Sequence, residues 1–423
     1  MPSFCLCLQA HQPYRLRPFS FFDIGNGHLY EDEEGSRAVL DNAADNCYLP
    51  VNALLLELIR EHHGDFRLAF SLTGTLLEQL EKYRPDTLES FRRLVATGCV
   101  ELLGGTYFHS LAFLFSAREF KEQVRLHREK ISSLFDQHPL TFRYPELIYN
   151  NRLAELAAGM GYRAIMADGV DRVRDGQGVN LVYRPRGGQK IKLLLKNHPL
   201  SDDIALPLAD ARGAADPLKA DKVAQELSEI RDVSQVVNLC LDYESLGLHQ
   251  EREKGIFAFL RALPVMISQA GFSFRTPAEA VRDRAPAALL EIPCSTSRAD
   301  QERAFTARLG NALQKDAIYT LYAMEAKVRR RKDPALLNIW RQLQTSDYFS
   351  SMRNGQLADG AEHNYFSNHE SPYDVYINYM NILDDFSRRL TPSRPQASKN
   401  KSALSYGDRW EICPQSKTRR QVS

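Results

Sequence analysis

The sequence predicts an α/β protein in which a barrel of parallel strands is followed by a helical domain. Three observations lead to this fold class. Short apolar runs recur along the first two thirds of the chain, helical patterns separate most of them, and polar residues follow nearly every run. Strands that alternate with helices form a parallel sheet. An open doubly wound sheet fits the alternation too, but polar residues at the carboxyl ends of the strands favour a barrel.

Seven strands are expected, because seven short runs are nearly continuous in apolar residues, as doubly buried parallel strands are. The runs are Ser3–Leu8, Phe66–Leu72, Val100–Leu103, Thr141–Tyr144, Tyr162–Ala167, Ile191–Leu195 and Val236–Leu241. The helical patterns that separate most of them are Val51–Arg60, Thr75–Tyr83, Ala117–Phe135, Arg152–Met160 and Leu218–Ile230.

The fourth run has an informative end. Pro145 cannot donate to a strand ladder and biases Tyr144 toward extended geometry, so the strand stops here. Asn150 and Asn151 are suitable N-cap residues for the helix that follows. Glu146 is therefore expected just past the carboxyl end of a strand, where barrel enzymes hold their reactive groups.

A long segment from Arg15 to Asn46 is acidic in its middle, at residues 31–34, and is expected to be a lid or an exposed insertion. Beyond Pro286 helical spacing dominates. We therefore divide the chain into a barrel over 1–285, a helical domain over 286–390 that completes the active-site cleft, and a disordered tail over 391–423. The tail carries seven Lys and Arg against two Asp and Glu.

Charge and composition narrow the classes of partner. The formal net charge is +1, from 54 basic and 53 acidic residues, which argues against nucleic acid or an anionic membrane as the main partner. The sequence has neither a basic leader, which would predict export, nor a long apolar segment, which would predict a membrane span. The 7 cysteines are scattered without a Cys-x-x-Cys pair and are typical of reduced thiols, so a cytoplasmic location is expected.

Two carboxylates at strand ends, Glu146 and Asp242, are the pair that glycoside hydrolysis requires. Glu244 lies two residues beyond Asp242, on the same side of an extended chain, and like charges held close raise one pKa. From spacing alone, Glu244 could be the acid and Asp242 its modulator. His11, His109, His198 and His249 also lie near strand ends, so a metal-dependent deacetylase is an alternative, although no local ligand pair supports it.

Five segments resemble glycoside hydrolase family 57, most closely its α-amylase branch. They are His11-Gln12-Pro13, the run from Gly104 to Ser110 that contains His109, the run from Phe142 to Tyr149 that contains Glu146, the run from Leu241 to Gln250, and Thr345-Ser346-Asp347-Tyr348-Phe349. The resemblance implies an incomplete (β/α)7 barrel followed by a helical region.

The resemblance also implies roles. Glu146 matches the nucleophile of a retaining α-glucan hydrolase and Asp242 matches its general acid and base, which selects Asp242 over Glu244. The implied substrate-binding residues around the reacting sugar are His11, Gln12, His109, Glu244, His249 and Asp347. Neither a metal nor another cofactor is expected, and the expected partner is an α-1,4-glucan or maltodextrin.

The chain departs from the family pattern in its aromatic residues. Family α-amylases carry tryptophans near the positions of Arg298, Arg308 and Glu251, whereas this chain has only Trp340 and Trp410. Aromatic faces are platforms for sugar rings, so the glucan-binding surface is expected to differ. Three functions within the resemblance therefore remain: hydrolysis, 4-α-glucanotransferase or branching activity with the same residues, and non-catalytic glucan binding.

Overall fold

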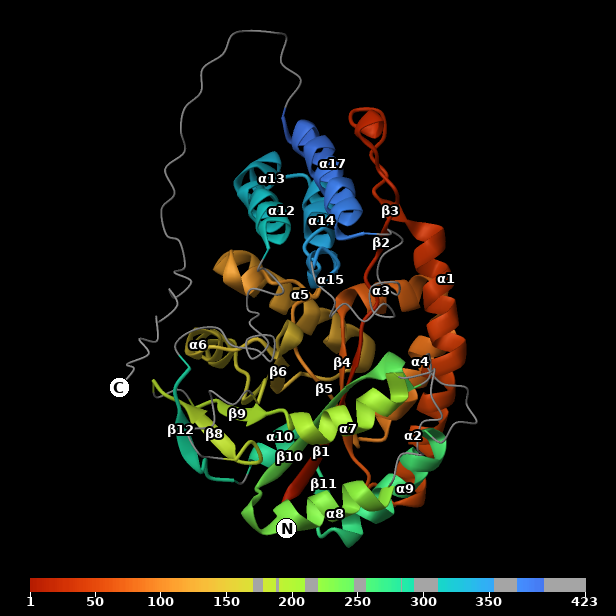
Figure 1. Ribbon diagram of the computed structural model, residues 1–423, viewed down its shortest axis with the longest axis vertical. Coiled ribbons are helices and arrows are strands. Elements are labelled where there is room, and N and C mark those ends of the chain that lie inside the picture. Colours follow the sequence, from red (N-terminus) through yellow and green to blue (C-terminus); the bar gives the residue numbers. More distant parts are fainter. Residues whose placement is uncertain are drawn as a thin grey trace, which may run out of the picture.

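The computed structural model describes residues 1–169, 178–187, 190–209, 220–246, 256–282, 284–292, 311–353 and 371–391. Within these residues seven parallel strands form a ring, as the sequence predicts. In ring order they are β1 (Ser3–Ala10), β4 (Leu68–Leu72), β5 (Val100–Leu102), β6 (Thr141–Arg143), β7 (Ala164–Ala167), β9 (Lys192–Leu195) and β10 (Val236–Asp242). Figure 1 shows the strands in the lower part of the molecule, with the C-terminal helices above them.

The ring closes through two single parallel bridges that join two sheets. Gly104 bridges Phe142 between β5 and β6, and Lys196 bridges Asn238 between β9 and β10. At the first bridge the Arg143 amide donates to the Gly104 carbonyl at 2.8 Å. A Cβ at residue 104 would approach the Tyr162 hydroxyl oxygen to 2.3 Å, so a side chain here would displace the Tyr162 ring.

Five further strands lie outside the ring in the described residues. β8 (Val182–Pro185) runs antiparallel to β9, β12 (Ala288–Leu290) pairs with β8, and β11 (Ser273–Phe274) pairs with β1. The other two, β2 (Arg15–Leu16) and β3 (Glu31–Asp32), pair only with each other. Since β12 still belongs to a barrel sheet, we propose that the barrel continues a few residues past the predicted boundary at 285.

Helices surround the ring on its outer side. They are α1 (Glu33–Ala43), α2 (Leu49–Glu61), α3 (Gly74–Tyr83), α4 (Pro85–Ala96), α5 (Ala117–Phe135), α6 (Asn151–Gly159), α7 (His198–Ala209), α8 (Ala220–Ile230), α9 (Ile256–Gln269) and α10 (Pro277–Arg282). The short helical turns are η1 (Phe21–Asp23), η2 (Ala44–Tyr48), η3 (Ala112–Leu114), η4 (Pro145–Leu147), η6 (Arg231–Val233) and η7 (Tyr243–Leu246).

The side chains of the strands alternate between two environments, as the period of two requires. On β1, Cys5 and Cys7 belong to the cluster that fills the ring, together with Met166 and Cys240. The intervening residues, such as Leu6, point outward into the layer of helices. The reactive groups at the strand ends therefore continue a face that points into the ring.

The segment from Arg15 to Asn46, expected to be a lid or an exposed insertion, has regular secondary structure. It contains the β2–β3 hairpin and the helix α1. Asp32 caps that helix by accepting a hydrogen bond from the Gly35 amide at 2.9 Å. The acidic run therefore lies at a helix N-terminus, where negative charge is stabilised by the helix dipole.

The C-terminal helices are α12 (Ala312–Ala323), α13 (Glu325–Arg331), α14 (Pro334–Gln342), α15 (Ser346–Ser350) and α17 (Pro372–Leu390). Their apolar faces share one core cluster with the outer side of the barrel, which includes Phe142, Leu153, Trp340 and Ile382. The helical domain is therefore packed on the barrel through a continuous apolar core. Of the predicted tail, only Thr391 lies within the described residues.

An ion-pair network joins the helical domain to α5. Glu119 is 0% exposed and accepts hydrogen bonds from Arg329 at 2.7 Å and from Arg341 at 2.9 Å. The same two arginines also pair with Glu122. Burial removes Glu119 from water, which costs free energy. The ion pairs with the two guanidinium groups offset most of this desolvation cost.

We expect Glu119→Gln to lower the free energy of unfolding by roughly 3 kcal/mol, since it leaves two partly buried arginines short of a partner. The matched control is Glu129→Gln, which breaks the exposed Arg125–Glu129 pair on the same helix and should cost at most about 0.5 kcal/mol. Urea denaturation followed by circular dichroism measures both. Equal losses in the two variants would show that the network does not stabilise the domain contact.

Candidate active site

The carboxyl end of β6 presents Glu146 in an unusual backbone conformation. Glu146 has φ of 59° and Leu147 has φ of 53°, two successive non-glycine residues in the left-handed region. Hydrogen bonds hold this turn: the Leu147 amide donates to Tyr144, and the Leu147 carbonyl accepts from the Asp168 amide at 3.2 Å. Just after it, Asn150 caps α6 by accepting from the Leu153 amide, as predicted. The half-buried Glu146 is thus held by neighbours on β6 and β7.

The end of β10 separates its two acids. Asp242 is exposed and is the last strand residue, in register with Gln9 of β1. The chain then enters the η7 turn, so the prediction that Asp242 and Glu244 share one side of an extended segment is wrong. Glu244 is buried and accepts hydrogen bonds from the Tyr48 hydroxyl at 2.6 Å and from the His11 amide at 3.0 Å.

Burial raises the pKa of Glu244 to about 7. The hydrogen bonds from Tyr48 and His11 act against this increase, whereas the charge of Asp242 adds to it. The sequence-based expectation that one acid of the pair has a raised pKa is therefore met, with burial as its main cause.

His11 connects three parts of the chain at the carboxyl end of β1. Its Nδ1 lies 2.9 Å from the Thr73 hydroxyl, and its Nε2 lies 2.8 Å from Oδ2 of Asp347. Its main-chain amide is the donor to Glu244. With both ring nitrogens engaged, His11 acts as a support that orients the groups around it.

The helical domain delivers Asp347 to this position. Thr345 forms an antiparallel bridge with Ser110, and the Ser346 amide donates to the His109 carbonyl at 3.0 Å. The His109 ring stacks on His11 with centroids 4.2 Å apart. Burial alone would raise the pKa of Asp347, but the adjacent His11 and His109 and the Thr345 hydroxyl hold that pKa well below its usual range. Asp347 is thus held as a carboxylate.

A second set of charged groups lies beside Glu146. Asp168 follows the ring-facing Met166 of β7, is buried, and pairs with Nε2 of His198 at the start of α7. The hydrogen bond from Cys7 lowers the pKa of the Cys240 thiol, and the charges of Lys196 and Arg143 act in the same direction. Cations from β6 and β9 therefore lie near the interior of the ring.

The six predicted substrate-binding residues divide into three groups. His11, Glu244, His109 and Asp347 form one connected cluster. Gln12 is buried, and its side chain donates to the Tyr48 hydroxyl at 3.4 Å. It therefore contacts the cluster indirectly, through Tyr48. His249 lies outside the described residues.

Sequence reasoning did not assign Tyr48, Thr73 or Thr345, which hydrogen-bond to the cluster. Thr73 carried a usable signal, because it directly follows a predicted strand. Thr345 carried one too, because it opens the fifth family segment and donates to Asp347 two residues later. Tyr48 lies far from His11 and Glu244 in sequence, and no local pattern marks its contact with the site.

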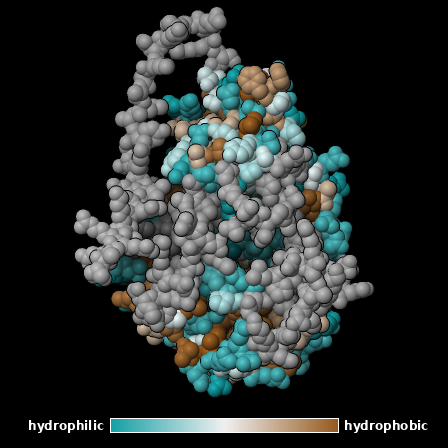
Figure 2. All heavy atoms as spheres, in the orientation of Figure 1, coloured by the Kyte–Doolittle hydropathy of each residue, from teal (hydrophilic) through white to brown (hydrophobic). Residues whose placement is uncertain are grey.

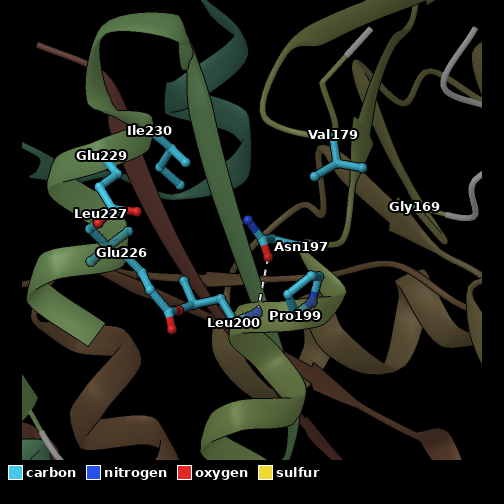
Figure 3. Close-up of a pocket in the computed structure, with 9 residues that line it drawn as sticks. All are labelled: Gly169, Val179, Asn197, Pro199, Leu200, Glu226, Leu227, Glu229 and Ile230. Atoms are coloured by element: carbon cyan, nitrogen blue, oxygen red, sulfur yellow. Dashed lines mark hydrogen bonds between the residues drawn. The ribbon is translucent and has the colours of Figure 1, made fainter. Parts of the chain in front are cut away.

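A cavity of about 280 Å³ lies elsewhere, between α7, α8 and the carboxyl end of β7 (Figure 3). It is lined by Gly169, Val179, Asn197, Pro199, Leu200, Glu226, Leu227, Glu229 and Ile230. No predicted site residue lines it, and its acids belong to the outer helix α8. We therefore do not place the reaction there.

Two further findings concern the described residues. No three His, Cys, Asp or Glu side chains among them are grouped as they would be around a metal ion. In the same residues, no helix combines the length and apolar character that a membrane span needs.

Comparison with known proteins identifies the family. The sequence model described as glycosyl hydrolase family 57 matches residues 5–293, well over half of the 423-residue chain. A curated protein of Methanocaldococcus jannaschii, named "Putative alpha-amylase", is 36% identical over 394 residues, which cover 89% of this chain and 82% of that protein. The chain belongs to glycosyl hydrolase family 57. The resemblance found in the five segments is thereby confirmed.

Solved structures share the fold of this family 57 chain at low identity. A branching enzyme of Pyrococcus horikoshii matches with a TM-score of 0.65 and 14% identity, over 91% of this chain and 88% of that one. A 4-alpha-glucanotransferase of Thermococcus litoralis matches with a TM-score of 0.60 and 16% identity, over 84% of this chain. This chain spans 54% of the length of that glucanotransferase. The (β/α)7 barrel with C-terminal helices is confirmed as the fold class.

The family assignment makes the protein a member of a glycoside hydrolase family, as the sequence predicted. The positions at which the chain departs from the pattern of family 57 α-amylases, Glu251, Arg298 and Arg308, lie outside the described residues.

The buried Glu244 makes stability depend on pH. Its folded pKa of about 7 exceeds the ordinary value of 4.5, so the folded protein retains a proton that the unfolded chain releases. The corresponding stabilisation, on the order of 3 kcal/mol, is fully present below about pH 4.5 and is lost as the pH rises through about 7. We expect Glu244→Gln to remove this dependence.

Urea unfolding at several pH values between these limits measures the effect. The control is Glu129→Gln, an exposed site whose replacement should leave the pH profile of the wild type unchanged. A wild-type profile that keeps the same slope after Glu244→Gln would mean that Glu244 titrates normally in the folded protein.

Proposed function

We propose that this protein is a retaining glycoside hydrolase that acts on α-1,4-glucans or maltodextrins, with Glu146 as nucleophile and Asp242 as general acid and base. One observation carries the assignment of the two acids. Glu146 follows β6 and Asp242 ends β10, and in the ring of seven these strands are three steps apart, the greatest possible separation. Acids at opposite sides of a barrel mouth can act on opposite faces of one sugar.

In the first step the Glu146 carboxylate attacks the anomeric carbon while Asp242 donates a proton to the departing glycosidic oxygen. The bond to the leaving sugar breaks as the ester bond to Glu146 forms. The backbone at Glu146 and Leu147 supports this role, because a turn held by hydrogen bonds on both sides keeps the carboxylate in one orientation.

In the second step Asp242 removes a proton from water, and the water oxygen attacks the anomeric carbon and releases Glu146. Two displacements at the same carbon restore the α configuration. The exposure of Asp242 supports its role over that of Glu244, because a group that exchanges protons with water must reach it. Glu244 is engaged by Tyr48 and His11, which is typical of a positioning residue.

The ionised Asp347 is suited to accept hydrogen bonds from sugar hydroxyls, while His11 keeps it in place. We also propose that the helical domain completes the cleft, since it supplies Asp347, which bonds to His11 at the carboxyl end of β1. No step of this chemistry requires a metal. A cytoplasmic location remains a prediction from the cysteine pattern.

We expect Glu146→Gln to lower the release of reducing ends from maltoheptaose by about 1,000-fold or more, because an amide cannot form the ester intermediate. The control is Glu155→Gln, which removes an exposed acid on the following helix, paired with Arg152, and should leave the rate unchanged. Equal rates for Glu146→Gln and wild type would remove Glu146 from the mechanism. A wild type that binds glycogen without any turnover would instead be a non-catalytic glucan-binding homologue.

A second candidate function is transfer to another sugar, as in a 4-α-glucanotransferase or branching enzyme. It is favoured by the shared fold of two solved structures named for these activities. The same glycosyl–Glu146 ester would then react with a sugar hydroxyl instead of water. Chromatography of products from maltotriose separates the two: we expect glucose and maltose with a matching gain of reducing ends. Longer oligosaccharides without that gain would assign transfer as the main reaction.

A further inference from the structure

The turn between β2 and β3 exposes large apolar side chains. Phe21 is 70% exposed, Phe22 is 84% exposed, and Leu29 is 76% exposed. Phe21 and Phe22 form the η1 turn, which Figure 1 shows projecting beyond the body of the molecule beside α17. In Figure 2, brown and tan atoms gather at the top of the molecule, over this turn. We call Phe21 and Phe22 the aromatic tip.

The segment that carries the aromatic tip is bound along one face of α17. The Phe19 amide donates to Asn378 at 2.5 Å, and the Phe19 carbonyl accepts from Asn381 at 3.0 Å. Farther along the helix, the buried Asp385 accepts from the Gly25 amide at 2.7 Å. The tip is therefore held in place on both sides, and its exposure is a property of a fixed turn.

The same segment buries its other aromatic residues. Phe19 and Tyr30 are buried, lie edge to face with centroids 5.5 Å apart, and belong to the core of the helical domain. The Tyr30 hydroxyl also donates to Asp385 at 2.5 Å. The turn thus has an apolar core available next to it, and the aromatic tip nevertheless faces solvent.

The geometry and surroundings of the tip suit a neutral sugar chain. The two rings are nearly perpendicular, at 79°, with centroids 6.0 Å apart, so a flat ligand can lie on one ring against the edge of the other. Polar side chains belong to the same turn: the Ser20 hydroxyl donates to Asp23, and the Asn26 side chain donates to the Phe22 carbonyl. Sugars present both an apolar C–H face and hydroxyl groups, and these contacts match both.

The exposed area is too small for a stable contact with a second copy. Two phenylalanines and one leucine supply roughly 400–500 Å², whereas a stable protein interface buries about 800 Å² on each partner. The arginines nearest the tip, Arg17 and Arg389, lie over the rings of Phe19 and Tyr30. Two such arginines are fewer than the cluster of roughly four to eight lysines and arginines that an anionic membrane surface would select. A glucan chain can bind to an area of this size, because each sugar ring stacks on a single aromatic face.

We propose that the aromatic tip is an accessory binding site for α-glucan chains, separate from the catalytic acids, which holds polymeric substrate on the enzyme. This inference rests on the proposed function for the class of ligand. The hairpin follows the carboxyl end of β1 after four residues, so the tip rises from the same side of the barrel as His11. The only tryptophan in the described residues, Trp340, is fully buried, which leaves the tip as a prominent exposed aromatic pair.

The test uses the full chain and native gels cast with and without glycogen. Phe21→Ala combined with Phe22→Ala should weaken the retardation of the protein by glycogen by roughly fivefold or more. Its catalytic rate on maltotriose should equal that of the wild type, because this substrate is too short to engage both sites. The aromatic replacement Phe22→Trp should retain the retardation.

The matched control combines Tyr373→Ala with Ile377→Ala, two exposed apolar residues on α17, and should leave retardation unchanged. Unchanged retardation in the tip variant, or no retardation of the wild type, overturns the proposal. So does a tip variant that keeps full retardation but loses an oligomer of the wild type in size-exclusion chromatography. Repeating the gels with Glu146→Gln separates binding from turnover, so failure of the hydrolase assignment leaves this result readable.

Discussion

Two parallel bridges, Gly104–Phe142 and Lys196–Asn238, decide the geometry of the whole molecule. Without them the strands would form two separate sheets, and the ends of β6 and β10 would have no defined relation. With them, seven strand ends face one opening, and the ring-facing residues continue from the apolar interior into charged groups. At one bridge the absence of a side chain at Gly104 leaves room for the Tyr162 ring, which a Cβ there would meet.

His11 extends this constraint to the helical domain. Its three hydrogen bonds reach the end of β4, the turn after β10 and the start of α15. One residue thus connects three elements. The bridge between Ser110 and Thr345 holds the same contact from the other side. Behind it, the apolar core and the pairs between Glu119 and two arginines keep the domains in register. The position of Asp347 therefore depends also on this core and on these ion pairs, which lie outside the site.

The strands and their order of appearance could be predicted because apolar runs of a parallel sheet are local signals. The capping role of Asn150 was equally local. The paired hairpin at β2 and β3 escaped prediction because its strands have two residues each and acquire their partners only in the fold. At the site, the placement of Glu146 and Asp242 at strand ends could be predicted, and Thr345 lies only two residues from Asp347, to which it donates. Tyr48 joins the cluster through a hydrogen bond to Glu244, 196 positions away, which no spacing rule encodes.

The pairing of β1 with β10 has a consequence for how the chain assembles during synthesis. β1 leaves the ribosome first, yet one of its edges waits for a strand that begins at Val236. The contact between His11 and Asp347 comes later still, since 336 positions separate them. One edge of β1 therefore stays unpaired until β10 has been synthesised, and an unpaired strand edge is prone to mispairing.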